Sequence, residues 1–340
     1  MDSSAANVAR RARGQIVVAR ALWYVKPGVA ELRPERLDPP HLGEARVQTH
    51  YSLISRGTER LVAYGEVPQS EWKTMRAPMQ AGEFPFPVKY GYSAAGVVTA
   101  GSAALLGKTV FCLHPHQDHF QVPEAMLVPV PDTIPARRAV LAANMETALN
   151  AHWDAGTGPG DKVLVIGAGV VGLLTAYLAR RIAGTDVTIA DIDPSRGELA
   201  FKLGLAFARP DALPGNSQIV FHTSARAAGL QSALDHAAFE GRIIDMSWYG
   251  SQPVSLMLGG AFHSRRLQLI SSQVGHVAPS RRGQVTRRER LERALGLLDD
   301  PALDSLVASE LAFEDTARHL TGIFSASTSG LAPVIRYAAH

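Results

Sequence analysis

The stretch VLVIGAGVVGLLTAYLA, residues 163–179, decides the fold. A membrane-spanning helix needs roughly 20 apolar residues. This run is shorter and has three glycines among its first ten residues. Residues 162–166 predict a strand buried on both faces of a parallel sheet, and the residues from Val170 onward predict a buried helix. A strand, a tight glycine turn and a helix form the context in which G-x-G-x-x-G indicates a dinucleotide site.

The three glycines have separate roles in this interpretation. Gly167 permits the turn, Gly169 lets the backbone approach a pyrophosphate, and Gly172 lets the helix pack closely against the strand. The helix N-terminus at Val170 and Val171 then presents unpaired N–H groups and a partial positive charge to the phosphates. The alternative is an α/β turn whose glycines are incidental.

An acidic residue at the expected distance favours the dinucleotide interpretation. A second strand, residues 186–190, ends at Asp191, which lies 19 residues after Gly172 and suits a carboxylate that accepts ribose hydroxyls. Asp191 would repel a 2′-phosphate, so NAD is the expected cofactor and NADP the alternative. Arg196 follows closely and would soften this preference, and Ile192 is a further expected cofactor contact.

Further strand and helix signals alternate after this point. Residues 218–221, 241–246 and 267–270 predict strands, and residues 227–239 predict a helix. The alternation predicts an α/β fold with a doubly wound parallel sheet.

Ligands bind at the carboxyl edge of such sheets, where the strands end. Thr223 and Ser224 follow one strand and Trp248 follows the next, so we expect all three to contact the cofactor. Trp248 and Tyr249 could equally line the substrate side of the pocket or pack in the core.

The N-terminal half has a different pattern. Residues 15–25, 28–37 and 44–55 are strand-like and are separated by proline and glycine turns. A helix is expected over 136–155, and a closing strand over 332–337. We therefore predict a flexible arm, a β-rich domain, a nucleotide domain and a returning tail, with these bounds: 1–14, 15–146, 147–278 and 279–340.

The composition excludes several classes of function. The chain has 340 residues and a net charge of +3, too small to indicate nucleic-acid binding, and no groove-reading motif is present. Cys112 is its only cysteine, which excludes a disulfide framework and fits a reducing compartment. The first residues contain arginines and no apolar region typical of a signal peptide, so we expect a cytoplasmic protein without a membrane partner.

Three motifs give the chain a family resemblance over nearly its whole length. They are residues 39–47, with Pro39-Pro40 and Gly43-Glu44, residues 91–98, and the glycine motif at 167–172. The chain resembles the medium-chain dehydrogenase/reductase superfamily. The resemblance implies a GroES-like β-barrel catalytic domain, a Rossmann domain that binds NAD(P), an active site in the cleft between them, and a homodimer formed near residues 267–270.

The zinc ligands of many such enzymes are replaced in this chain. The resemblance places them at Ser55, at Tyr92 and near Ala143 or Asn144, and the four-cysteine structural loop is absent. Hydroxyl, phenol and amide groups do not make a normal zinc site, so we expect no zinc. Residues 54–59 resemble the I-S-x-G-T-E segment of a zinc-free branch that includes bacteriochlorophyllide dehydrogenase.

A second metal hypothesis concerns the hairpin around residue 115. Cys112, His114, His116, Asp118 and His119 lie within eight positions, and strand alternation would bring the first three to one side. We favour a metal-free polar hairpin with the thiol in the core, because local spacing alone seldom gives closed tetrahedral geometry.

Without a metal, proton transfer and charge stabilisation depend on side chains. Tyr92 offers a phenol, Ser55 could relay a proton, Arg56 could hold an anionic substrate, and His116 could exchange a proton with solvent. Thr147 is expected to contact the nicotinamide or its ribose. For each residue the alternative is an ordinary structural role.

The resulting hypothesis is a zinc-independent, NAD(H)-dependent oxidoreductase for a carbonyl, alcohol or enone. The alternatives are oxidation of a hydroxyethyl group on a tetrapyrrole-like substrate, and a non-catalytic dinucleotide-binding sensor. The arginines after residue 280 indicate either a solvated helix face or an electropositive rim that steers an anionic substrate.

Overall fold

The computed structural model describes residues 16–325 and 331–338, and the chain divides into two compact units. Of the described residues, the first unit contains 16–141, 307–325 and 332–338, and the second contains 142–306 and 331. The flexible arm predicted for residues 1–14 lies outside the described residues.

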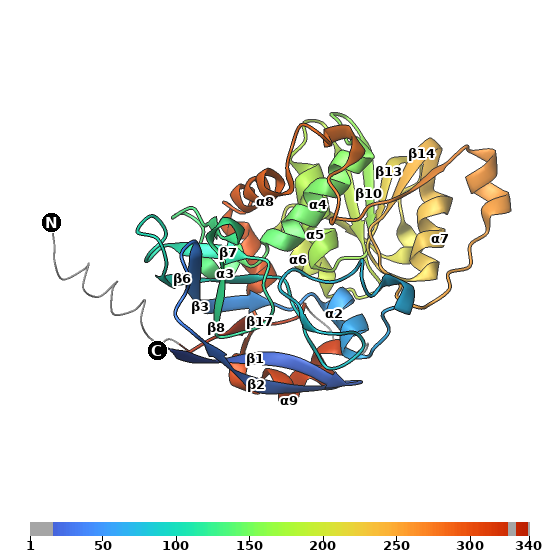
Figure 1. Cartoon of the computed structure of the whole chain (residues 1–340). Helices are drawn as coiled ribbons and strands as arrows, with labels where there is room; N and C mark the ends of the chain where they lie inside the picture. The colour runs from blue at the N-terminus through green and yellow to red at the C-terminus, as the bar shows by residue number, and fades with distance from the viewer. Residues whose placement is uncertain (1–15, 326–330, 339–340) are drawn as a thin grey trace. The chain divides into compact units, whose positions relative to one another are not determined.

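The second unit is built on a parallel sheet, and its strands lie side by side in Figure 1. Within the described residues the sheet has six strands in the order β12-β11-β10-β13-β14-β15. The chain begins at the central strand β10, adds β11 and β12 on one side, and then crosses to add β13, β14 and β15 on the other side. This is the doubly wound order predicted from the sequence. The strands are β10 (Lys162–Ile166), β11 (Asp186–Ala190), β12 (Ala206–Ala208), β13 (Ser217–His222), β14 (Ala237–Asp245) and β15 (Gln268–Ser271).

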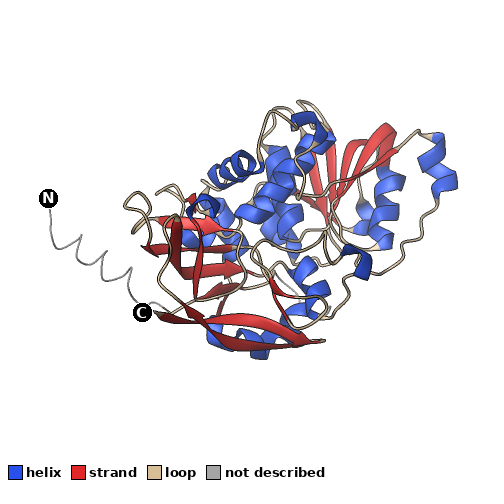
Figure 2. Cartoon of the chain, in the orientation of Figure 1, coloured by secondary structure: helices blue, strands red, loops and turns tan. Residues whose placement is uncertain are grey.

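Helices flank this sheet, as Figure 2 shows, and cover its apolar strands. Val163, Leu164 and Val165 of β10 are all buried, as the continuous aliphatic run predicted. Burial of each such side chain contributes about 1.5–3 kcal/mol to the free energy of folding. The helices of this unit are α4 (Ala142–Ala155), α5 (Val170–Arg180), α6 (Arg196–Lys202), α7 (Ala227–His236) and α8 (Arg287–Gly296).

The first unit is mainly antiparallel β-structure. In the described part of the chain, one sheet has the order β2-β1-β5-β4, and a larger one has the order β16-β17-β3-β6-β7-β9, with β8 paired to β3. Its strands are β1 (Val17–Lys26), β2 (Val29–Leu37), β3 (Glu44–Leu53), β4 (Ala81–Gly82), β5 (Val88–Lys89), β6 (Ala94–Ala100), β7 (Thr109–Cys112), β8 (His119–Pro123), β9 (Val128–Pro129), β16 (Glu310–Ala312) and β17 (Val334–Arg336). Its helices are α2 (Arg56–Ala63), α3 (Ala136–Ala139) and α9 (Phe313–Phe324).

An irregularity in β3 sets the direction of a functional side chain. The register of β3 against β6 shifts between Thr49 and Tyr51, so His50 is an extra residue in the strand. A bulge of this kind reverses the in–out alternation beyond it. Ser52 is therefore buried, although Val47 and Thr49 set the opposite phase.

The helix predicted over 136–155 is two helices, α3 and α4. The Leu141 amide donates to the Arg138 carbonyl three residues back, which tightens the turn and interrupts the α-helical ladder. Leu141 is also the last residue of the first unit before Ala142 begins the second.

The predicted domain bounds need correction at two places. The first unit ends at 141 rather than 146, and the tail returns to it at 307 rather than 279. The reason is that α8 packs on α4 inside the second unit, where Arg290 forms a buried ion pair with Glu146. No helix in the described ranges is both long and apolar enough to cross a bilayer.

Candidate functional site

The glycine turn between β10 and α5 has the geometry that its sequence predicts. Gly167 has φ +110°, a conformation that favours glycine, and a Cβ atom there would lie 2.7 Å from the Thr223 hydroxyl. A Cβ atom at Gly172 would lie 1.8 Å from the Gly167 carbonyl oxygen. Both positions therefore require glycine for packing.

Gly169 is different, because its surroundings are open. Among the described atoms, none lies within 4 Å of a Cβ placed at Gly169, and no described side chain caps α5. The Val170 and Val171 amides are in the first turn of the helix, where intrahelical acceptors are absent. This open helix N-terminus is suited to a phosphate group.

Asp191 lies beside the turn at the end of β11. Its Oδ2 accepts from the Ala168 amide at 2.6 Å, and its Oδ1 accepts from the Asp193 amide at 2.9 Å. Each carboxylate oxygen has more than one acceptor site, so these bonds orient Asp191 and leave capacity for a hydroxyl donor.

Two other predicted cofactor residues follow Asp191. Ile192 is 80% exposed, which leaves an apolar side chain open to a ligand. Arg196 is buried, and its Nε lies 3.4 Å from Asp193 Oδ2, so the guanidinium forms an ion pair with Asp193.

Two of the residues predicted to contact the cofactor donate their hydroxyl hydrogen bonds to backbone carbonyls. Thr223 donates to the Gly167 carbonyl at 2.8 Å, and Thr147 donates to the Ala143 carbonyl at 3.0 Å. Thr223 therefore supports the glycine turn, and Thr147 supports its own helix. Trp248 is half-buried, and the Ser224 hydroxyl lies 2.8 Å from His222 Nε2.

The first unit contains a buried polar cluster around His116, whose exposed fraction is 0%. His116 Nε2 lies 2.9 Å from Glu59 Oε2, and His116 Nδ1 lies 2.7 Å from Ser52 Oγ. Ser52 Oγ lies 2.8 Å from the Tyr337 hydroxyl. A neutral His116 with its proton on Nε2 pairs every group, because Tyr337 donates to Ser52, Ser52 to His116, and His116 to Glu59.

Glu59 is the acceptor on which this cluster converges. It is fully buried, and its Oε2 also accepts from the Tyr24 hydroxyl at 2.8 Å. Its Oε1 accepts from the Ser55 amide at 2.7 Å, at the start of α2. Three donors reach one buried carboxylate, and burial with a partner is the condition under which an acidic side chain is tolerated in a core.

Tyr92 adjoins this cluster. Burial raises the pKa of Tyr92 to about 12, against the opposing effect of hydrogen bonds with Ser55 and Thr58, so its phenol is protonated at neutral pH. The preceding residue, Gly91, has φ +120°, and a Cβ there would lie 2.9 Å from His116 Cδ2. Gly91 thus allows the segment between β5 and β6, which carries Tyr92, to pass close to the buried imidazole.

The structure changes the predicted roles of His116 and Arg56. Direct proton exchange between His116 and solvent is wrong, because the bulge in β3 and helix α2 enclose the ring between Ser52 and Glu59. The Arg56 guanidinium donates to the Ser325 carbonyl at 2.5 Å and is only partly exposed, so it joins α2 to the C-terminal segment.

The cysteine–histidine hairpin is dispersed into separate environments. Cys112 lies in an apolar cluster with Val98 and Phe120, as predicted for a core thiol. His114 stacks on Phe120 with ring centroids 4.0 Å apart, and burial lowers the pKa of His114 to about 3. Asp118 pairs with Arg20 at 3.2 Å.

The donor set does not fit a zinc ion. Among the described residues, no group of three or more His, Cys, Asp or Glu side chains could hold a metal. His116 already uses both ring nitrogens, and Ser55 and Tyr92 offer a hydroxyl and a phenol in place of thiolate and imidazole.

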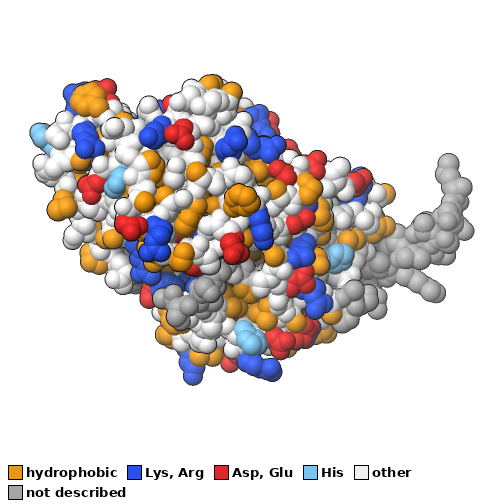
Figure 3. All heavy atoms as spheres, turned by 180° about the vertical axis from the view of Figure 1, so that it is seen from behind, with side chains coloured by type: hydrophobic (Ala, Val, Ile, Leu, Met, Phe, Trp, Pro, Cys, Tyr) orange, Lys and Arg blue, Asp and Glu red, His pale blue; other side chains and the backbone are white. Residues whose placement is uncertain are grey.

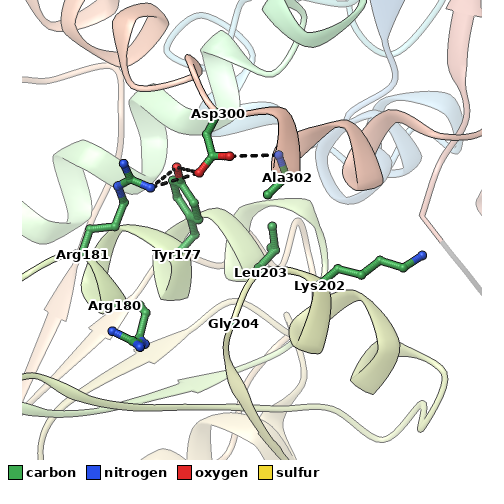
Figure 4. Close-up of a pocket in the computed structure, with 8 residues that line it drawn as sticks. All are labelled: Tyr177, Arg180, Arg181, Lys202, Leu203, Gly204, Asp300 and Ala302. Atoms are coloured by element: carbon green, nitrogen blue, oxygen red, sulfur yellow. Dashed lines mark hydrogen bonds and ion pairs between the residues drawn. The ribbon is translucent and has the colours of Figure 1, made fainter.

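A surface pocket of about 270 Å³ lies elsewhere in the second unit, as Figure 4 shows. Tyr177 donates to Asp300 at 2.8 Å, and Arg181 pairs with the same carboxylate at 3.0 Å. Arg180 and Lys202 also line the pocket. None of the predicted site residues lines it, so this pocket is separate from the glycine turn.

The basic segment after residue 280 is only partly a solvated face. Arg288 pairs with Glu292 on the surface, whereas Arg290 is 2% exposed and its Nε lies 3.0 Å from Glu146 Oε1. Arg290 also donates to the Asn150 side chain at 2.5 Å. On the face shown in Figure 3, acidic and basic side chains are interspersed. Arg290 is therefore a core residue that charge patterning alone could not identify.

Comparison with known proteins begins with sequence. No protein-family model matches the chain. An L-threonine 3-dehydrogenase of Rhizobium rhizogenes is 38% identical over 84 residues, which are 25% of this chain and 24% of that relative. The matched part of the chain thus spans about a quarter of the length of this relative and of the other curated L-threonine 3-dehydrogenase that it resembles to the same degree.

Solved structures match over almost the whole chain. A protein of Sinorhizobium meliloti 1021, named a candidate zinc-binding dehydrogenase and bound to NADP, has a TM-score of 0.74 at 17% identity and covers 94% of this chain and 99% of its own. A protein of Escherichia coli CFT073, named a short chain alcohol dehydrogenase and complexed with NADH, has a TM-score of 0.72 at 17% identity, with coverages of 94% and 98%. The fold is therefore the dehydrogenase fold of a GroES-like domain and a Rossmann domain. This is the α/β fold that the sequence predicted.

Proposed function

We propose that the protein is an NAD(H)-dependent oxidoreductase that interconverts a carbonyl or enone with the corresponding reduced compound. The observation that carries the proposal is the turn at Gly167–Gly172, with its open helix N-terminus and the oriented carboxylate of Asp191. Proteins of the same fold have been solved with NADP and with NADH, which supports a nicotinamide cofactor here.

The proposed cofactor site uses groups that are already oriented. The Val170 and Val171 amides would bind the pyrophosphate, and Asp191 would accept the ribose hydroxyls. Ile192 would cover the adenine with its exposed side chain. When bound, the nicotinamide supplies or accepts the hydride. The carboxylate of Asp191 disfavours a 2′-phosphate, so NAD is the proposed cofactor.

We propose that the reaction proceeds without zinc and that Tyr92 handles the proton. The reacting oxygen gains negative charge when hydride reaches the carbonyl carbon, and a positioned donor must stabilise it. Tyr92 is protonated at neutral pH and is hydrogen-bonded to Ser55 and Thr58. Glu59 holds the Ser55 end of this hydrogen-bonded group in place, because it accepts from the Ser55 amide and from His116.

The proposed chemistry predicts that a chelator has no effect on turnover, whereas Tyr92→Phe lowers it. With NADH and a panel of ketones, aldehydes and enones, dialysis against a strong chelator should leave turnover unchanged. Tyr92→Phe removes the phenolic proton and should lower kcat by about 100-fold or more. Tyr51→Phe is the matched control, because Tyr51 lies on β3 outside the polar cluster.

The results distinguish three ways in which the proposal could fail. Loss of turnover on chelation, with stoichiometric zinc in the purified protein, would contradict zinc independence. Unchanged kcat in Tyr92→Phe would show that another group is the acid. Tight NADH binding with no oxidation across the panel would favour the binding-only alternative.

A further inference from the structure

Three side chains at the carboxyl edge of the second unit's sheet form a serine–histidine–aspartate array. Ser224 Oγ lies 2.8 Å from His222 Nε2, and His222 Nδ1 lies 3.0 Å from Asp245 Oδ1. Asp245 is fixed by the Tyr249 hydroxyl and by the Ser247 amide, each 3.0 Å from one of its oxygens. This order of atoms is the one in which an imidazole can take a proton from a serine hydroxyl while a carboxylate fixes its tautomer.

The imidazole is shielded, whereas the serine residue is partly exposed. His222 is fully buried, whereas Ser224 is partly exposed and is followed by the exposed residue Ala225. The desolvated base is held on both sides, at Nδ1 by Asp245 and at Nε2 by Ser224. A base in this setting keeps one orientation toward the serine, which is the condition for efficient proton transfer.

Ser224 also lies on a sharp turn from a strand to a helix. Strand β13 ends at His222, α7 begins at Ala227, and Ala225 between them has φ +50°, a left-handed conformation that is rare for alanine. Nucleophilic serines of hydrolases occupy turns of this kind. The flanking glycines of that motif are absent here. Gly229 provides the space instead, because a Cβ there would lie 2.3 Å from Ser224 Oγ.

The same helix provides donors for an oxyanion. In the part of the chain that the structure describes, no side chain caps α7. The amides of residues 227–229, in its first turn, therefore have no intrahelical acceptor. Gly229 brings this turn against Ser224 Oγ. An oxyanion that forms on a carbon bonded to Ser224 Oγ would lie near a partial positive charge.

We propose that Ser224, His222 and Asp245 form an acyl-transfer site for small, uncharged carboxylic esters. Ser224 Oγ bonds to the acyl carbon, the ester C–O bond breaks, and the proton passes through His222 to the leaving alkoxide. Water then attacks the acyl carbon, loses its proton to His222, and releases the acid and the free serine. The residues that follow Ser224, 225–228, are exposed, and three of these four are alanines, which leaves room for a short acyl group.

Two measurements on the full chain, without any dinucleotide, test this site. The wild type should hydrolyse p-nitrophenyl acetate at least about 100-fold faster than Ser224→Ala, and His222→Gln should lose activity to a similar extent. Ser232→Ala is the matched control, because Ser232 is a partly exposed residue of α7 whose hydroxyl donates to the Ala228 carbonyl. It should retain the wild-type rate.

The second measurement needs no variant, so it does not depend on how a variant folds. A fluorophosphonate probe should label the wild type at one site, and peptide mapping should place the added mass on Ser224. Wild-type protein that stays unlabelled, a label on another residue, or equal hydrolysis by wild type and Ser224→Ala would each overturn the proposal. These outcomes do not involve NADH, so they are distinguishable from failure of the proposed oxidoreductase function.

Discussion

Gly169 and Gly172 are glycines for different reasons: an added methyl group would clash with the protein at Gly172 but would meet open space among the described residues at Gly169. A Cβ at Gly172 would lie 1.8 Å from a backbone oxygen, whereas a Cβ at Gly169 would meet no described atom within 4 Å. Gly169 also has φ −76°, which alanine adopts without strain. The spacing of the glycines predicted both roles, but only the structure shows which position has free space around it.

This difference gives a paired prediction. Gly172→Ala should lower the free energy of unfolding by about 1–3 kcal/mol, because the backbone must move to admit the methyl group. Gly169→Ala should leave stability unchanged and weaken NADH binding at least about tenfold, because the methyl group would occupy the space for the pyrophosphate. Urea unfolding and NADH fluorescence titration measure the two effects. Equal loss of stability in both variants would contradict the assigned roles.

At the scale of elements, local patterns predicted β10, α5 and β11 well, because each is continuous and its periodicity follows from its own residues. Contacts between distant residues could not be predicted in this way. The pair of Arg290 and Glu146 is 144 residues apart, and that of His116 and Glu59 is 57 apart. The arginine run after residue 280 therefore has the pattern of a solvated face, although the structure places residues 279–306 in the second unit.

The α4–α8 contact provides a test at this scale. Arg290→Ala leaves Glu146 buried without its partner, and burial already raises the pKa of Glu146. We expect a loss of about 3–5 kcal/mol in the free energy of unfolding, because an unpaired buried charge is costly. Arg288→Ala, on the exposed side of α8, should cost at most about 0.5 kcal/mol. Similar urea midpoints for the two variants would show that α8 does not stabilise this unit as described.

At the scale of the whole molecule, each unit presents its own groups for the proposed reaction. The second holds the glycine turn, and the first holds Tyr92 with the buried cluster of Glu59 and His116. The fold is shared with proteins that are only 17% identical, which fits a scaffold that keeps its sheet order while its site residues change. The proposed replacement of zinc ligands by Ser55 and Tyr92 would be such a change.

A homodimer is the expected assembly, and β15 is the strand at which it can be tested. In the described part of the sheet β15 is an edge strand, and its Leu269 is 40% exposed. Unpaired edges of this kind can pair with a second copy. Light scattering should give twice the chain mass, and Leu269→Lys should lower it, whereas Leu42→Lys, at an exposed leucine of the first unit, should not. A monomer in the wild type would contradict this assembly.

The central claim is that the turn after Ile166 binds a dinucleotide. Calorimetric titration with NADH tests it most directly. We predict one site per chain, weaker binding of NADPH, and at least about tenfold weaker NADH binding in Asp191→Asn. Asp211→Asn, an exposed acidic residue on the surface of the same unit, should bind as the wild type does. An absence of heat with either coenzyme, or equal NADH affinity in Asp191→Asn and wild type, would contradict the claim.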